Sequence, residues 1–147
     1  MNVVYYKFKI IILEDNGFYN NLLTRKLSYY VDEMAPDKNC DIEISSFTSY
    51  FDFLRNLKPD LDIAIVDYYL GQGITGTDAI KKLKKICPDC KIIIISQSQN
   101  LNSGLLPLIN GADAFVYKDN RAFDNSCFIV EEMINDKIKD KQSNLFS

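Results

Sequence analysis

The 147-residue sequence contains no histidine, no long hydrophobic run and no basic cluster of the kind that duplex binding needs. No apolar segment approaches the roughly 20 residues of a membrane-spanning helix, and the N-terminus lacks a signal-peptide pattern. The net charge of -3 does not suit a protein that binds duplex nucleic acid, because such binding needs a basic surface. We therefore expect a cytoplasmic protein that contacts neither a membrane nor nucleic acid directly.

Cysteine is also scarce, and two of the four cysteines form a CxxC motif from Cys87 to Cys90. A zinc site would need two further ligands, but the chain has no histidine, and Cys40 and Cys127 are distant single residues. Redox-active CxxC pairs usually open a helix, whereas this pair lies between an expected helix and an expected strand. We interpret the motif as structural.

The composition is that of an ordinary globular protein, with 47% hydrophobic and 25% charged residues. The length suffices for one hydrophobic core. We predict a single domain over residues 1–147, with a core from about 7 to 139 and a frayed tail over 140–147.

Hydrophobic patterning predicts strands and helices in strict alternation. The expected strands are 7–13, 41–47, 61–67, 91–95 and 114–117. The expected helices are 17–35 with Asn16 as its cap, 48–57, 77–87 with Thr77 as its cap, a weak helix over 100–110, and 124–139. In the first helix the expected apolar positions include Phe18, Leu22, Leu23 and Leu27.

Such alternation is typical of a parallel sheet that helices cover on both faces. The strand over 41–47 alternates apolar and polar residues and belongs at an edge, whereas the strands over 7–13, 61–67 and 91–95 are apolar throughout and belong in the centre. The flavodoxin-like strand order 2-1-3-4-5 satisfies both conditions. The predicted fold is therefore an α/β, flavodoxin-like (βα)5 three-layer sandwich with a parallel five-stranded sheet.

Acidic residues follow two strands that this order makes neighbours. Glu14 and Asp15 come directly after the first strand, and Asp67 ends the third. In open α/β sheets, ligands bind in the crevice at the carboxyl ends of the strands. Ser96 and Lys118, at the ends of the fourth and fifth strands, complete the rim of this expected site.

Three clustered carboxylates repel one another and take up protons unless a cation neutralises them. Carboxylates, carbonyl groups and water are the ligands that Mg²⁺ prefers, so the sequence predicts a Mg²⁺ site. A carboxylate nucleophile, Mg²⁺, an ammonium group and a hydroxyl group are together what phosphoryl transfer onto an aspartate requires.

With these residues in this order, the chain resembles the receiver domain of two-component response regulators, over about residues 7–139. Receiver domains accept a phosphoryl group from the phosphohistidine of a histidine kinase. The resemblance implies that Asp67 is the phosphoacceptor. It also implies that Asp15 is a direct Mg²⁺ ligand and that Glu14 is a second acid acting largely through water.

The resemblance assigns four further roles. The backbone carbonyl of Tyr69 is a metal ligand, Ser96 is the switch hydroxyl, Phe115 is an aromatic switch that swings inward on activation, and Lys118 binds phosphate. On this interpretation the chain is not an enzyme with a separate substrate, because it catalyses only its own phosphorylation and dephosphorylation.

The resemblance also implies partners. The phosphoryl donor is a sensor histidine kinase or a phosphotransfer protein. Phosphorylation would shift an existing equilibrium and reshape the face formed by residues 100–139, which contacts an effector domain or a second copy of the chain. The chain is then either a stand-alone receiver or the N-terminal piece of a longer protein.

Three positions depart from the usual receiver pattern. After Asp67, Gly71 stands where proline is usual, and residues 74–76 occupy the offset of a usual glycine, which indicates a one-residue insertion. Asp119 replaces the usual proline after Lys118, as is often seen in receivers attached to helix-turn-helix output domains. Gln97 replaces the usual small residue after Ser96 and would restrict access to Asp67.

Two alternatives bear on the same residues. A pseudo-receiver, which binds partners without turning over phosphate, stays open because of Gln97 and the altered loop. A hydrolase of the haloacid dehalogenase type is rejected, since that family needs an acid two residues after its nucleophile and this chain has Tyr69 there. Each site residue also has an ordinary explanation, such as helix capping for Asp15, but their coincidence at successive strand ends favours a site.

Overall fold

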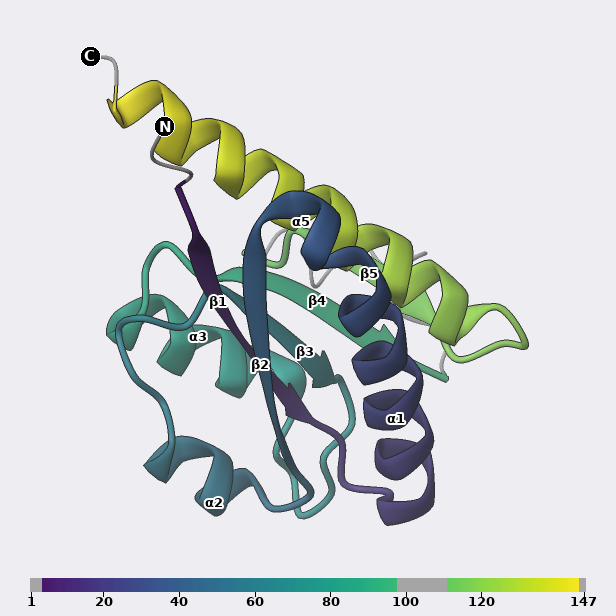
Figure 1. The fold of residues 1–147 in the computed structure, drawn as a ribbon. Helices are drawn as coiled ribbons and strands as arrows, with labels where there is room; N and C mark the ends of the chain where they lie inside the picture. Colours follow the sequence, from purple (N-terminus) through teal and green to yellow (C-terminus); the bar gives the residue numbers. More distant parts are fainter. Residues whose placement is uncertain (1–3, 98–110, 146–147) are drawn as a thin grey trace.

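A computed structural model of the chain describes residues 4–97 and 111–145, which form one sheet between two layers of helices (Figure 1). The strands are β1 (Tyr6–Leu13), β2 (Cys40–Phe47), β3 (Ile63–Asp67), β4 (Lys91–Ser96) and β5 (Ala114–Tyr117). The helices are α1 (Gly17–Met34), the 3₁₀ turn η1 (Pro36–Lys38), α2 (Tyr50–Arg55), α3 (Gly76–Ile86) and α5 (Ala122–Leu145). The predicted helix over 100–110 lies outside the described residues.

The sheet has the predicted order β2-β1-β3-β4-β5, and all four neighbouring pairs are parallel. The alternating strand β2 lies at an edge, and the three apolar strands β1, β3 and β4 lie in the centre. The flavodoxin-like architecture is therefore confirmed. Because the strands are parallel, the segments that follow β1, β3 and β5 emerge at the same edge of the sheet.

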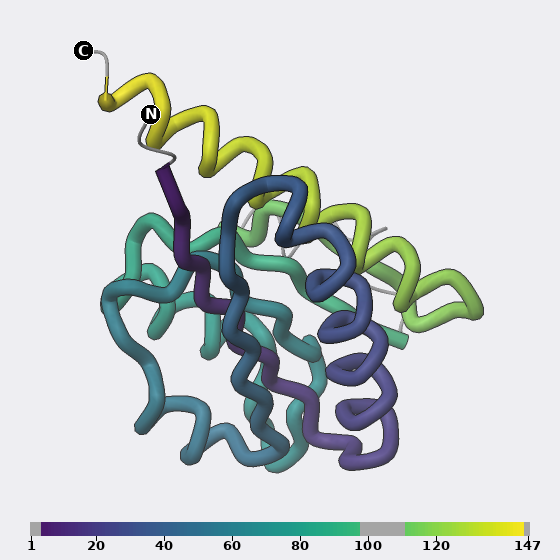
Figure 2. The backbone as a smooth tube through the Cα atoms, viewed as in Figure 1, coloured from purple at the N-terminus to yellow at the C-terminus, as the bar shows by residue number. Residues whose placement is uncertain are grey.

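Two core clusters fill the two faces of the sheet. One cluster packs under α1 and α5, which run side by side in Figure 2, and it contains Ile12 of β1 and Ile65 of β3. The other packs under α2 and α3 and contains Leu13. Since side chains alternate along a strand, Glu14 and Asp67 continue the first set and belong on the face under α1 and α5.

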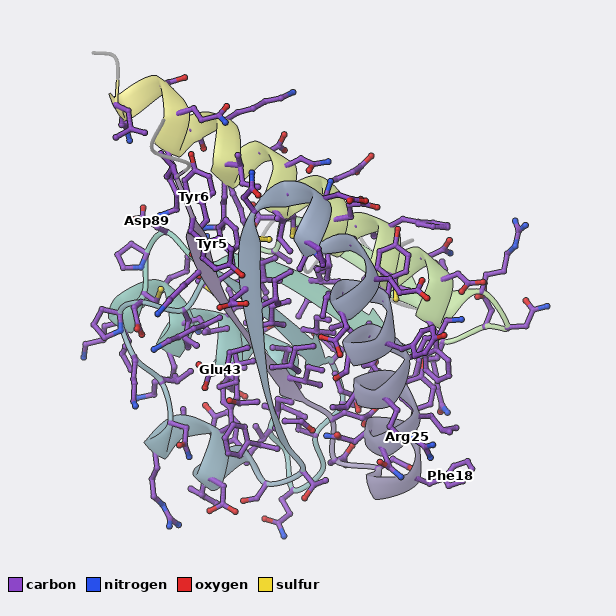
Figure 3. All side chains as sticks on the ribbon, in the orientation of Figure 1. Tyr5, Tyr6, Phe18, Arg25, Glu43 and Asp89 are labelled. Atoms are coloured by element: carbon purple, nitrogen blue, oxygen red, sulfur yellow. The ribbon has the colours of Figure 1, made fainter. Side chains whose placement is uncertain are left out.

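The inner face of α1 differs from the prediction at two positions. The buried residues of this helix include Leu23 and Leu27, but Phe18 is 75% exposed and Leu22 is 36% exposed. Figure 3 shows Phe18 pointing away from the body of the protein. At 100° per residue, Leu23 and Leu27 share one face of the helix, while Phe18 lies on the opposite face and Leu22 is turned well away from the buried one.

The N-terminus of α3 also differs from the prediction, because Thr75 rather than Thr77 is the N-cap. The carboxylate of Asp78 accepts a hydrogen bond of 2.9 Å from the backbone nitrogen of Thr75. This is one half of a capping box, whose spacing of three residues places the N-cap two residues before the predicted one.

The last helix is longer than predicted. α5 runs from Ala122 to Leu145, so the predicted helix end at Lys139 is wrong, while fraying of the tail stays a prediction. The segment contains neither glycine nor proline, and nothing in its sequence stops the helix at Lys139. Within the part of the chain that the structure describes, no helix has the length and hydrophobicity needed to cross a membrane.

Cys87 and Cys90 are unpaired thiols, and each is 1% exposed. The sulfur of Cys87 lies 3.0 Å from the carbonyl oxygen of Pro59 and 2.9 Å from that of Leu61. Burial raises the pKa of both thiols and so disfavours the reactive thiolate. The contacts support the interpretation of the CxxC motif as structural.

Truncating a side chain on the buried face of α1 should lower the free energy of unfolding more than truncating one on the exposed face. Leu27→Ala removes a side chain with no exposed surface, so we expect the free energy of unfolding to fall by about 2–5 kcal/mol. Leu22→Ala on the same helix is the matched control and should cost less than about 1 kcal/mol. Urea denaturation of both variants measures the difference, and equal costs would contradict the assignment of the buried face.

Candidate functional site

Three charged side chains meet at the carboxyl edge of the sheet, under α1 and α5. Glu14 directly follows β1, Asp67 ends β3 and Lys118 directly follows β5. Glu14 has no exposed surface and Asp67 is 4% exposed. The ammonium of Lys118 contacts Glu14 Oε1, and its Nζ lies 3.4 Å from Asp67 Oδ2. The strand order thus brings these three predicted site residues together.

Asp15 completes an acidic cluster at the same place. Glu14, Asp15 and Asp67 each offer a carboxylate oxygen, and these oxygens all lie within 4.8 Å of one another. Asp15 is exposed, whereas the other two are buried. The cluster borders a pocket of about 390 Å³ whose lining residues are Asp15, Asn16, Asp67, Tyr69, Gln97 and Lys118.

The cluster has an excess of negative charge. Burial, and then the hydrogen bond and charge of Glu14, raise the pKa of Asp67 to about 8, and Lys118 only partly opposes this. Glu14 Oε2 accepts a hydrogen bond of 3.1 Å from the backbone nitrogen of Asn16, but Glu14 Oε1 has no well-aligned hydrogen-bond donor. Closely spaced oxygens that one ammonium does not neutralise are a donor set that fits Mg²⁺.

Asn20 fixes the backbone that carries the first two acids. Its side-chain nitrogen donates to the carbonyl oxygen of Glu14 at 3.0 Å and to that of Phe47 at 2.9 Å. Its side-chain oxygen accepts from the hydroxyls of Thr24, at 3.1 Å, and Ser46. Asn20 therefore ties α1 to the ends of β1 and β2, and it is 5% exposed.

The sequence prediction missed Asn20. A signal was present, because this polar residue is one helical turn before Leu23 on the buried face of α1. A polar residue on a buried face needs hydrogen-bond partners inside the protein, and here those partners lie beside the acidic cluster.

Tyr19 was missed as well. Its ring lies under the ammonium of Lys118, with Nζ 4.5 Å from the ring centroid. Burial, followed by the charges of Glu14 and Asp67, raises the pKa of Tyr19 to about 12, so its side chain is a neutral phenol at neutral pH. Local sequence carries no signal for this contact, because α1 and the end of β5 are about 100 residues apart in the chain.

The loop between β3 and α3 folds back on itself beside the cluster. Tyr69 pairs with Thr75 in an antiparallel bridge, and Tyr69 is 49% exposed at the pocket. Gly71 has a φ of 76°, and a Cβ atom there would lie 4.0 Å from Asp15 Oδ2. The loop therefore approaches the acids closely at a glycine, while metal binding by the carbonyl of Tyr69 stays a prediction.

Ser96 and Phe115 are the two switch residues that the resemblance implies, and neither lines the pocket beside the acidic cluster. Ser96 is fully buried at the end of β4, and its carbonyl oxygen accepts a hydrogen bond of 2.9 Å from the nitrogen of Lys118. Phe115 packs against the core cluster under α2 and α3. Gln97, rather than Ser96, lines the pocket. The switch roles of Ser96 and Phe115 stay predictions.

Solved structures similar to this chain include response regulators and their receiver domains. The response regulator DrrB from Thermotoga maritima, an OmpR/PhoB homologue, is 18% identical with a TM-score of 0.69, over 89% of this chain and 54% of that chain. The BeF3-activated DrrB receiver domain is 19% identical with a TM-score of 0.69, over 88% of this chain and 98% of that chain. A receiver domain protein from Clostridium thermocellum is 20% identical with a TM-score of 0.69, over 88% and 96% of the two chains.

These likenesses show that the chain has the receiver fold, and that it spans about half the length of the intact DrrB response regulator. No protein-family model matches the sequence, and no curated protein matches it.

The raised pKa of Asp67 predicts a pH-dependent stability. Between its ordinary value of 3.8 and about 8, the folded protein keeps a proton on Asp67 that the unfolded chain has lost. The free energy of unfolding contributed by Asp67 therefore falls as the pH rises through this window. We expect Asp67→Asn to be more stable than the wild type at pH 8, with an advantage that shrinks toward pH 4.

Urea denaturation without divalent cations at several pH values measures this advantage. Asp119→Asn is the matched control, because Asp119 is exposed beside the site and should show no such dependence. A constant difference between wild type and Asp67→Asn at all pH values would contradict the prediction.

Proposed function

We propose that the chain is a phosphoacceptor receiver, which takes a phosphoryl group from a histidine kinase or phosphotransfer protein onto Asp67. The observation that carries the proposal is the meeting of Glu14, Asp15, Asp67 and Lys118 at one edge of the sheet. A likeness of fold alone would not suffice, because one fold can support many functions.

Asp67 is the nucleophile in this proposal. One of its carboxylate oxygens attacks phosphorus as the nitrogen–phosphorus bond of the donor phosphohistidine breaks. The electron pair of that bond stays on the histidine nitrogen, which takes a proton from water. Lys118, which lies 3.4 Å from Asp67, binds the oxygens of the transferred phosphoryl group.

Glu14, Asp15 and Asp67 would hold Mg²⁺, with the carbonyl of Tyr69 as a further ligand. When bound, Mg²⁺ supplies positive charge that keeps the carboxylates ionised and neutralises phosphoryl oxygens. The chain then catalyses only its own phosphorylation and dephosphorylation, so it is a signalling domain rather than an enzyme with a separate substrate.

The partner face would include β5 and α5. A groove of about 380 Å³ runs between these elements, and its lining includes Phe115, Tyr117, Phe128 and Ile129. In the proposal, Ser96 bonds a phosphoryl oxygen and Phe115 turns inward, which changes the shape of this groove. An effector domain or a second copy of the chain would bind the changed face.

A pseudo-receiver is the second candidate, and one feature of the pocket favours it. Tyr69 and Gln97 both line the pocket beside Asp67, which is only 4% exposed. Large side chains at this place restrict the approach of a phosphodonor. A pseudo-receiver would bind its partners through the same fold without accepting phosphate.

Intact mass after incubation with acetyl phosphate and Mg²⁺ tests the proposal. We expect the wild type to gain one phosphoryl group, and we expect no gain without Mg²⁺ or in Asp67→Asn. Asp62→Asn is the matched control, because Asp62 lies at the opposite end of β3, and it should be phosphorylated like the wild type.

Absence of any gain, in wild type whose circular dichroism shows an intact fold, would favour the pseudo-receiver. Gln97→Ala should then be assayed in the same way. Recovery of phosphorylation in that variant would show that access to Asp67, rather than the chemistry of the site, is limiting.

Metal binding gives a separate prediction. Mg²⁺ should raise the urea midpoint of the wild type, because a ligand that binds only the folded state stabilises it. Asp15→Asn should weaken this effect on the order of tenfold in Mg²⁺ concentration, since it removes one charged ligand. Asp89→Asn, an exposed residue away from the cluster, is the control, and an equal shift in both variants would contradict the assigned site.

A further inference from the structure

Tyr19 occupies a place from which it contacts both the site and the last helix. It lies in the first turn of α1, where its backbone nitrogen donates to the side chain of the N-cap Asn16 at 2.9 Å. On one side its ring packs against Phe123 of α5, with centroids 5.1 Å apart and planes at 52°. On another side the ring faces the ammonium of Lys118 at 4.5 Å.

The ammonium of Lys118 therefore has protein groups on three sides. It contacts the carboxylate of Glu14, lies 3.4 Å from Asp67 and sits over the ring of Tyr19. An ammonium has three N–H donors, and these three neighbours can receive them. The Lys118 side chain is only 7% exposed, so the ring stands where water would otherwise solvate the cation. A cation–π contact is strongest under such desolvated conditions.

We propose that Tyr19 is a positioning residue that holds Lys118 in place for phosphoryl transfer. This inference rests on the proposed function of Asp67 as phosphoacceptor. The ring fixes the ammonium between Glu14 and Asp67, and it does so through a contact that does not compete with the incoming phosphoryl oxygens. Lys118 can turn its N–H donors from the carboxylates to the phosphoryl group while the ring keeps the nitrogen in position.

If Tyr19 only packs α1 against α5, replacing another tyrosine with the same packing role should have the same effect. Tyr30 serves as this control. Tyr30 lies on the same helix and also packs against α5, with its ring 6.0 Å from that of Phe128. Its hydroxyl donates to Glu131 at 2.6 Å. Tyr30 thus shares the packing of α1 on α5, but its partners Phe128 and Glu131 are not residues of the site.

The test compares phosphorylation rates by acetyl phosphate and Mg²⁺ in Tyr19→Phe, Tyr19→Leu, Tyr19→Met and Tyr30→Leu. Leucine and methionine keep the apolar volume but remove the ring, so we expect a loss on the order of tenfold in the rate constant. Phenylalanine keeps the ring and should restore most of the rate. Tyr30→Leu should lower stability without a comparable loss of rate.

Nuclear magnetic resonance supplies a readout that packing alone would not move. The ε-methylene group of Lys118 is bonded to the nitrogen that lies 4.5 Å from the centroid of the Tyr19 ring, so we expect its proton resonances to be shifted upfield. The shift should persist in Tyr19→Phe and Tyr30→Leu and disappear in Tyr19→Leu and Tyr19→Met. Two ring-free variants keep the test informative if one of them does not fold.

The possible failures are distinguishable. A wild type that gains no phosphoryl group overturns the proposed function and this inference with it. A wild type that is phosphorylated, while the folded Tyr19→Leu or Tyr19→Met variant reacts as fast, overturns only the role of Tyr19. Equal loss of rate in Tyr19→Leu and Tyr30→Leu also overturns that role, because it reduces Tyr19 to helix packing.

Discussion

The interaction on which this site depends is between one ammonium group and a set of carboxyl groups at the end of a buried sheet. Lys118 contacts Glu14 and lies beside Asp67, and all three side chains are removed from water. Buried charges are tolerated when they are paired, but here the acids outnumber the base. Burial, followed by the hydrogen bond and charge of Glu14, raises the pKa of Asp67, and the excess of acids makes the cluster a site that favours further positive charge.

The rest of the structure holds these groups where their charges matter. Asn20 joins the end of β1 to the end of β2 by donating one hydrogen bond to the carbonyl oxygen of Glu14 and one to that of Phe47, which fixes the backbone of Glu14. The ring of Tyr19 on α1 covers the ammonium of Lys118 and packs against Phe123 of α5. Glu14 and Lys118 thus lie directly beyond the ends of strands and are held by contacts from α1, and such fixed groups are what preorganised sites use.

The fold and the site carry different kinds of information. Receiver domains with 18% to 20% identity share the fold, which shows how little of a sequence the architecture requires. An apolar strand such as β3 tolerates many substitutions as long as volume and patterning are kept. The argument for phosphoryl transfer therefore depends on Asp67, its acidic neighbours and Lys118, which the fold positions but does not specify.

The sequence by itself determined the strand order and the residues at the strand ends. Continuous apolar runs identified β1, β3 and β4 as central, and the rules of parallel sheets then brought Glu14, Asp15 and Asp67 together. The exact start of α3 and the length of α5 were predicted wrongly, because helix ends depend on a single cap or on the lack of a stop signal.

The contacts of Tyr19 and Asn20 were decided only by the tertiary structure. Each residue contacts a group from another part of the chain: Tyr19 contacts Lys118, and Asn20 binds the carbonyl oxygen of Phe47. A local sequence pattern does not predict which side chains of two distant segments will meet.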